Sequence, residues 1–210
     1  MENGCSQHRV GTCFDGGREV LDLAGTAGGD DRNLDFLAHG ANHLEVKAFL
    51  GAVGVHRVKQ NLAGAIDAGL DVGVYFFSQA MDEQEAREEA RFVLDKISGY
   101  QLAYPVFFDW EKIGADARSD AMDLTSLTTV TDTFCSEIEA AGYQAGLYFN
   151  QQLGYEELHL PSLQGYTFWL AEYNDTPSFT YDFDLWQYAS DGSVDGIDGD
   201  VDLNLAFIGK

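Results

Sequence analysis

Hydrophobic and polar positions follow two different periods along the chain from residue 59 onward. Apolar residues recur at helical spacing in residues 59–68, 82–98 and 127–141, and a glycine follows each stretch. Apolar, β-branched and aromatic runs lie between and after these stretches, which predicts buried strands. The expected strands are residues 72–77, 104–110, 143–149 and 166–173, with short ones at 184–188 and 201–205, and a short helical segment is expected around 151–158.

This regular alternation of helices and strands predicts a parallel sheet with right-handed crossovers. Because the chain has 210 residues and its strands are apolar on both faces, we expect a small α/β barrel rather than an open sheet. No GxGxxG motif follows a strand, so a dinucleotide-binding sheet has no support. In parallel barrels the functional groups stand at the carboxyl ends of the strands.

Two acidic residues follow directly after the apolar part of the strand expected at residues 104–110. Asp109 and Glu111 are two residues apart, so in an extended chain their side chains point to the same side, with Cα atoms about 7 Å apart. Cleavage of a glycosidic bond needs one protonated carboxyl group and one ionised carboxylate. Mutual repulsion raises the pKa of one of the two and so separates their roles. The alternative interpretation is a pair of solvated acids that leads into a loop.

Asp202 lies inside a short apolar strand, where an unpaired buried carboxylate is expensive, so we expect it to have a function or a partner. The alternative is an acidic surface loop; the surrounding Asp residues lack the Gly and Glu of a calcium-binding EF-hand. Aromatic residues end the other strands, and their rings and hydroxyls suit sugar faces and sugar hydroxyls, although core packing explains any single one. They are Tyr75, Phe77, Tyr148, Phe149, Trp169, Tyr173, Trp186 and Tyr188.

Composition and charge exclude several classes of protein. Lys and Arg number 12 against 35 Asp and Glu, a formal net charge of −23, which opposes binding to nucleic acid or to an anionic membrane. No apolar run is long enough to span a bilayer, and no secretory signal is visible. Three cysteines without a CxxC pair predict neither a disulfide framework nor a metal knuckle. His159 is the only histidine after residue 58, so a histidine-dependent hydrolase is not expected.

Several segments in order resemble glycoside hydrolase family 25, the Chalaropsis-type lysozymes of bacteria and phages. They are NLAGAIDAGLDVGVYFFSQA (61–80), EAREEARFVL (85–94), PVFFDWE (105–111), GLYFN (146–150), WLAEY (169–173) and WQYASDGSVDGIDGDVDLN (186–204). The resemblance covers about residues 59–210. It implies an irregular eight-stranded barrel with fewer helices than a regular (β/α)8 barrel. It also implies hydrolysis of the β-1,4 bond between N-acetylmuramic acid and N-acetylglucosamine in peptidoglycan, with no metal or organic cofactor.

The resemblance also implies roles for individual residues. Glu111 matches the general acid, and Asp109 matches the partner that stabilises the cationic transition state or positions the substrate's acetamido group. Asp202 matches the acid of the final strand. The aromatic positions around the substrate groove are matched by Tyr75, Tyr148, Trp169, Tyr173 and Trp186. We expect a monomer that acts on the bacterial cell wall and binds its glycan strands.

Residues 1–58 differ in character from residues 59–210. They contain no Tyr and no Trp, and they carry 8 acidic and 5 basic residues. The family opens with a strand similar to Gly-Ile-Asp-Val-Ser, whose Asp belongs to the acidic cluster, and Asp15 is the nearest candidate for it. We therefore treat residues 1–58 as an atypical segment, either strongly diverged or read in a shifted frame. Either it supplies substitute strands, for example residues 53–58, or the barrel is unstable and weakly active.

Other functions remain as alternatives. A chitinase-like barrel of glycoside hydrolase family 18 also has an Asp-x-Glu strand end, but its further Asp positions are occupied here by Tyr104 and Phe107. A catalytically impaired, peptidoglycan-binding relative is favoured by the missing first-strand Asp and opposed by the intact Asp109, Glu111 and Asp202. A structural protein explains neither the position of the acids nor that of the aromatic residues.

Overall fold

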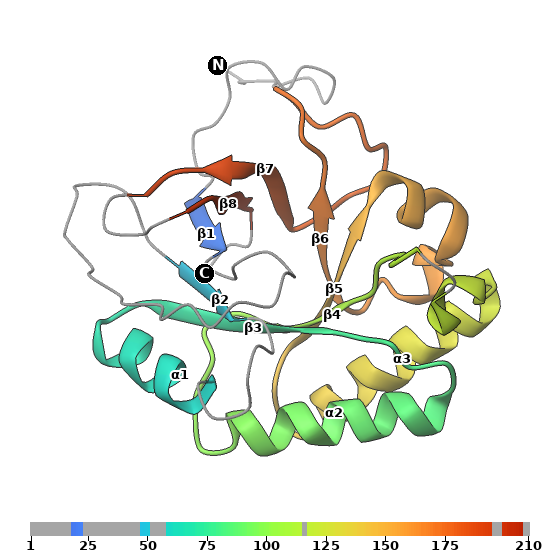
Figure 1. The fold of residues 1–210 in the computed structure, drawn as a ribbon, viewed down its shortest axis with the longest axis horizontal. Helices are drawn as coiled ribbons and strands as arrows, with labels where there is room; N and C mark the ends of the chain where they lie inside the picture. Colours follow the sequence, from blue (N-terminus) through green and yellow to red (C-terminus); the bar gives the residue numbers. More distant parts are fainter. Residues whose placement is uncertain (1–17, 23–46, 51–57, 115–116, 195–198, 208–210) are drawn as a thin grey trace, which may run out of the picture.

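The protein is an eight-stranded closed barrel with helices on one side (Figure 1). The structure is a computed structural model that describes residues 18–22, 47–50, 58–114, 117–194 and 199–207. The strands are β1 (Arg18–Asp22), β2 (Lys47–Leu50), β3 (Asp71–Phe77), β4 (Val106–Asp109), β5 (Ala145–Asn150), β6 (Thr167–Ala171), β7 (Leu185–Gly192) and β8 (Val201–Ala206). The helices are α1 (Val58–Asp67), α2 (Glu83–Ile97) and α3 (Leu124–Ala140), with short turns η1 (Arg118–Ala121), η2 (Leu153–Glu157) and η3 (Leu160–Ser162).

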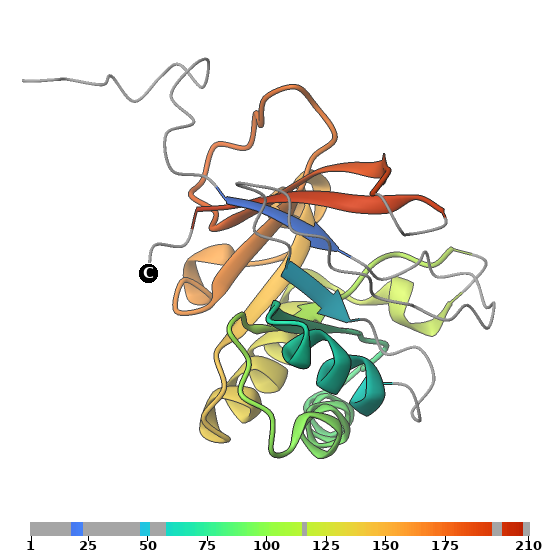
Figure 2. The same cartoon turned by 90° about the vertical axis from the view of Figure 1, so that its left-hand side faces the viewer.

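The strands follow one another around the barrel in sequence order. Neighbours from β1 to β7 are parallel, and β8 closes the ring by running antiparallel to both β7 and β1. The helices α1, α2 and α3 lie on the side of β3, β4 and β5, whereas the side of β7 and β8 has no long helix, as both views show (Figures 1 and 2). The expected irregular barrel with fewer helices than strands is therefore confirmed.

The helices form where the apolar spacing predicts them. The side chain of Asp82 caps α2 by accepting a hydrogen bond from the backbone N–H of Glu85 at 2.9 Å, and Asp123 caps α3 in the same way through Ser126 at 2.8 Å. The apolar face of α2 is buried and packs against α3. None of the helices in the described residues is long and apolar enough to cross a membrane.

The first two strands come from the atypical N-terminal segment, but not from the residues we expected. Residues 18–22 and 47–50 form β1 and β2, which close the barrel. Of the suggested strand at residues 53–58, Val58 begins α1, and residues 53–57 lie outside the described residues. The last strands also differ in length from the prediction, because β7 continues to Gly192 in its pairing with β8 through two irregular steps in register.

Alternating residues of the strands from β3 to β8 fill the inside of the barrel. The interior cluster consists of Tyr104, Phe107, Trp169, Leu185 and Ala206, with Tyr75 and Tyr148 packed against it. Gly146 is required beside Phe107, because a Cβ at this position would lie 2.5 Å from the Phe107 ring. The outward residues pack against the helices in a larger cluster. The packed interior therefore forms a floor, and the carboxyl ends of the parallel strands form the mouth above it.

Candidate active site

Strand β4 delivers Asp109 to the mouth of the barrel. Asp109 is the last residue of β4 and is buried, with 7% of its surface exposed. It shares the strand face of Phe107, which fills the interior, and it lies in register with Tyr148 of β5. The backbone N–H of Ser78 donates a 2.7 Å hydrogen bond to the carbonyl oxygen of Asp109, which continues the β3–β4 pairing to the rim. Asp109 is therefore held in a rigid strand end.

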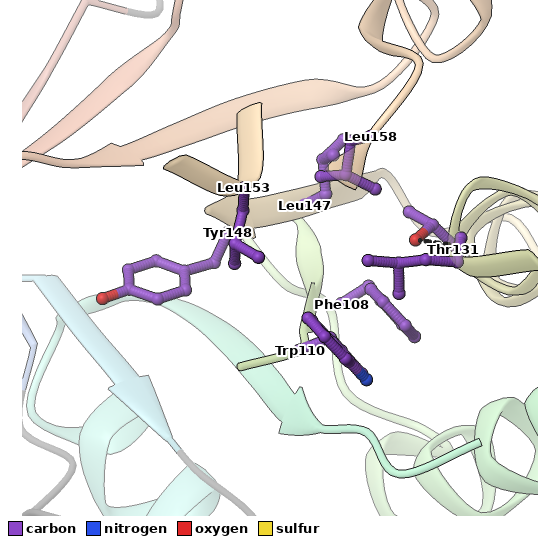
Figure 3. A pocket seen from close by; sticks show the side chains of 8 residues that line it. Phe108, Trp110, Thr131, Leu147, Tyr148, Leu153 and Leu158 are labelled. Atoms are coloured by element: carbon purple, nitrogen blue, oxygen red, sulfur yellow. Dashed lines mark hydrogen bonds between the residues drawn. The ribbon is translucent and has the colours of Figure 1, made fainter. Parts of the chain in front are cut away.

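Glu111 follows two residues later, beyond the end of the strand. The residue is exposed, but the protein around the mouth removes enough water from its carboxyl group to raise its pKa. Trp110 between the two acids is 2% exposed and lies on the opposite side of the segment, where it lines a small apolar cavity together with Leu153 and Leu158 of the η2 region (Figure 3). A carboxyl group that keeps its proton at higher pH is suited to act as a general acid.

Asp202 lies near Glu111 although 90 residues separate them in the sequence. Burial and the negative charge of Glu111 together raise the pKa of Asp202 to about 6. Its backbone lies on β8 in register with Asp22, the last residue of β1. Because β8 is antiparallel, its beginning meets the carboxyl ends of the other strands. The fold therefore brings Asp202 close enough to Glu111 for their charges to interact.

Two tyrosines converge on Gln187 beside these acids. The hydroxyl groups of Tyr148 and Tyr173 each donate a 2.8 Å hydrogen bond to Gln187 Oε1. Burial raises the pKa of both tyrosines, and the charge of Glu111 acts on both in the same direction. Figure 3 shows the Tyr148 ring pointing away from the cavity that Trp110 lines. Tyr148 and Tyr173 are therefore neutral hydroxyl groups close to the general acid candidate.

The remaining aromatic candidates lie deeper. Trp169 is 1% exposed, and its Nε1–H donates to Asn204 Oδ1 at 2.8 Å. The ring of Tyr75 packs edge-on against Trp169 with centroids 6.4 Å apart, so both belong to the floor below the mouth. Trp186 is buried on the outward face of β7, opposite Gln187, and its Nε1–H donates to the carbonyl oxygen of Glu172 at 2.8 Å. The structure does not bring Trp186 to the mouth.

Sequence reasoning did not identify three residues of this region. Gln187 and Asn204 are polar residues, 2% and 0% exposed, that serve the aromatic hydroxyl and indole groups. The sequence could have identified both, because each is a polar residue at a strand position that faces the barrel interior. Asp22 ends β1 beside Asp202, and its signal was an acid directly after Val20 and Leu21. Asp15, the nearest candidate in the sequence pattern, lies outside the described residues.

The part of the chain that the structure describes contains no group of three or more His, Cys, Asp and Glu side chains that could hold a metal ion. Cys135, the one cysteine in these residues, is buried in α3, and burial raises the pKa of its thiol. A buried neutral thiol is a poor nucleophile. The polar groups that the described residues bring to the mouth include carboxyl groups and tyrosine hydroxyls.

A barrel mouth that gathers carboxyl groups, among them Glu111 and Asp202 with pKa values raised by burial, suits the cleavage of a glycosidic bond. The family model of glycosyl hydrolases family 25 matches residues 37–197. The chain therefore belongs to this family and to the class of glycoside hydrolases. A search of curated protein sequences found no match.

Solved structures share the fold at low sequence identity. The modular autolysin LytC from Streptococcus pneumoniae, in complex with a synthetic peptidoglycan ligand, is 22% identical with a TM-score of 0.69, over 90% of this chain and 46% of that chain. The CTP1L endolysin is 23% identical with a TM-score of 0.67, over 90% and 66%. A bacterial lysozyme from Streptomyces coelicolor is 23% identical with a TM-score of 0.60, over 76% and 78%. The chain thus spans less than half the length of the LytC autolysin.

Proposed function

We propose that this chain hydrolyses the β-1,4 bond between N-acetylmuramic acid and N-acetylglucosamine in peptidoglycan. The observation that carries the proposal is the meeting of Glu111 and Asp202 at the mouth where Asp109 ends β4. Membership in glycosyl hydrolases family 25 supports the reaction class. The peptidoglycan ligand of LytC supports the substrate class. We expect the protein to act on the bacterial cell wall as a monomer.

The proposed reaction begins with Glu111 in its protonated form. Glu111 donates its proton to the glycosidic oxygen, the bond from this oxygen to C1 of N-acetylmuramic acid breaks, and N-acetylglucosamine leaves with a free hydroxyl group. The carboxylates of Asp109 and Asp202 stabilise the positive charge that develops at C1. Water then adds to C1 and returns a proton to Glu111, which leaves a new reducing end on N-acetylmuramic acid.

Asp22 is the candidate for the first-strand acid in this proposal. The resemblance implies an Asp of the acidic cluster in the first strand, and β1 ends at Asp22, whose backbone is in register with Asp202. The sequence pattern alone did not locate a first-strand acid, and Asp22 now offers one. This position supports an active enzyme over an impaired binding relative. We expect Asp22→Asn to lower the rate of hydrolysis, whereas a change at Asp15 is expected to matter less.

The first experiment compares the wild-type protein with Glu111→Gln on purified peptidoglycan. Reduction with borohydride followed by acid hydrolysis identifies the sugar at each new reducing end. We expect new muramic acid ends from the wild type and a loss of at least about a hundredfold in Glu111→Gln, because the amide cannot donate a proton as an acid. Glu156→Gln, an exposed acid on η2, is the matched control. Binding to peptidoglycan without new ends would instead identify an impaired relative, and new glucosamine ends would contradict the proposed bond.

A further inference from the structure

The segment that carries Glu111 is fastened on both sides, although the Glu111 carboxyl group itself accepts no hydrogen bond from the described residues. On one side, Trp110 is buried in the cavity wall below η2. On the other side, the backbone turns at Gly114, which has a φ of 76°. The position of the carboxyl group at the mouth therefore depends on what holds the backbone of residues 110–114.

Asp120 holds this backbone directly. Its Oδ1 accepts the backbone N–H of Ile113 at 2.9 Å, and its Oδ2 accepts the backbone N–H of Gly114 at 2.6 Å. Hydrogen bonds to an ionised carboxylate are shorter and stronger than bonds between neutral groups. Asp120 belongs to η1, which is itself anchored because Arg118 pairs with Glu85 of α2. The segment that carries Glu111 is therefore connected to helix α2 through Asp120 and Arg118 of η1.

A second contact ties the same segment to η2. Lys112, the residue after Glu111, forms an ion pair with Glu157 at the end of η2. The Glu157 side chain is 17% exposed, so this pair is partly shielded from water. The start of η2 is fixed in turn, because Asn150 Oδ1 accepts the backbone N–H of Leu153 at 2.9 Å. Lys112 and Asp120 thus fasten the segment to two different elements.

We propose that Asp120, assisted by the Lys112–Glu157 pair, is the positioning residue that holds Glu111 at the mouth of the barrel. The role of Glu111 as the acid rests on the proposed function above. A displacement of about 1 Å in a reacting group can lower a rate by about a hundredfold. Glu111 has no hydrogen bond of its own to the described residues. The contacts of Asp120 with the backbone and of Lys112 with Glu157 therefore form a clamp, and this clamp determines where Glu111 delivers its proton.

The clamp has a consequence that a purely structural role would not have. In Asp120→Asn, the amide keeps one acceptor oxygen but turns an NH2 donor toward a backbone N–H, so one of the two bonds is lost. The loosened segment exposes Glu111 to more water, and the pKa of Glu111 falls toward the ordinary value of about 4.3. A general acid works in its protonated form. The alkaline limb of the pH–rate profile therefore moves to lower pH, and kcat falls by about tenfold while KM changes little.

The test measures the pKa of Glu111 by 13C NMR on protein labelled at the Glu side-chain carboxyl carbon, with Glu111→Gln used to assign the signal. We expect a lower pKa in Asp120→Asn and an unchanged one in Asp123→Asn, which removes a comparable cap from α3 without touching the segment. Glu157→Gln should show a smaller fall, and Glu156→Gln none. If Asp120→Asn does not fold, Glu157→Gln decides the question.

The NMR result does not depend on activity, so the two proposals can fail separately. An unchanged Glu111 pKa in both Asp120→Asn and Glu157→Gln overturns the clamp, even if the wild type releases muramic acid ends. A lowered pKa in a protein that releases no new ends would keep the clamp and reject the proposed reaction. In an active protein, a lower Tm with an unmoved alkaline limb in Asp120→Asn would show a structural role only and would also overturn the proposal.

Discussion

Asp202→Asn is expected to make the protein more stable at neutral pH while it removes activity. Asp202 is half-buried beside the buried Val201 on β8, and burial and the charge of Glu111 raise its pKa to about 6. In the unfolded chain an aspartate has a pKa of about 3.9. The folded state therefore holds the Asp202 proton more tightly, and ionisation of this group above pH 6 opposes folding.

The magnitude follows from the difference between the two pKa values. A difference of about two pH units, at about 1.4 kcal/mol for each, corresponds to about 3 kcal/mol. This contribution to stability is fully present below about pH 4, is lost as the pH rises to about 6, and is absent at pH 7. An asparagine never ionises, but its amide must still be buried, so we expect a net gain of about 1–3 kcal/mol at pH 7. In a chain of this size, that corresponds to a rise in Tm of about 3–10 °C.

The assay is urea denaturation of the wild type and Asp202→Asn from pH 4 to pH 7.5, with Asp200→Asn as the control. Asp200 is exposed and lies two residues before Asp202. This control therefore removes one negative charge from a protein of net charge −23 but leaves the carboxyl group of Asp202 in the mouth. We expect the curves of the wild type and Asp202→Asn to meet near pH 4 and to separate as the pH rises. Parallel curves over this range, or an equal gain in Asp200→Asn, would refute the reasoning.

Two further predictions concern the floor of the barrel. Gly146→Ala should lower the free energy of unfolding by at least about 2 kcal/mol, because the new Cβ would lie 2.5 Å from the ring of Phe107. Gly165→Ala, where nothing lies within 4 Å, should leave the urea midpoint nearly unchanged, and equal midpoints for the two variants would contradict this account. Trp169→Phe should lower the free energy of unfolding by about 2 kcal/mol, since it leaves the buried Asn204 oxygen without the indole N–H. Urea denaturation checks this value, and a loss below about 0.5 kcal/mol would show that Asn204 is satisfied in another way.

The floor and the mouth share the same strands, which links stability to function. Tyr148 packs on Trp169 with ring centroids 5.1 Å apart, while its hydroxyl group reaches Gln187. Asn204 holds the Trp169 indole and lies two residues after Asp202 on the same face of β8. Substitutions in the floor are therefore expected to move groups of the mouth, even where they do not touch a carboxylate.

Local pattern determined most of the fold after residue 58. The spacing of apolar residues identified α1, α2 and α3, and an acid before the first turn identified the cap of α2 at Asp82. The structure shows a second cap of the same kind at Asp123, before α3. Continuous apolar runs identified the strands from β3 to β6. These features depend on interactions between residues that are close in sequence, so they can be read without knowing which strands pair.

The sequence also indicated the chemistry, because an acid in or after an apolar strand is costly without a purpose. Asp109, Glu111 and Asp202 were found in this way. Family resemblance assigned their roles, but it also included Trp186, which the structure places on the outer face of β7. The face of a strand on which a residue lies cannot be decided from composition, since a shift of one residue exchanges the two faces.

Only the tertiary structure decided how the barrel closes and which acid meets which. Residues 18–22 carry one short strand with little local signal, and it becomes a strand because β2 and β8 offer their backbone groups on either side. That pairing places Asp22 beside Asp202, and the rest of the ring brings Glu111 near Asp202. The raised pKa values arise from burial by segments far apart in the chain. The sequence by itself therefore determined the helices, most strands and the acids, whereas long-range pairing determined the site.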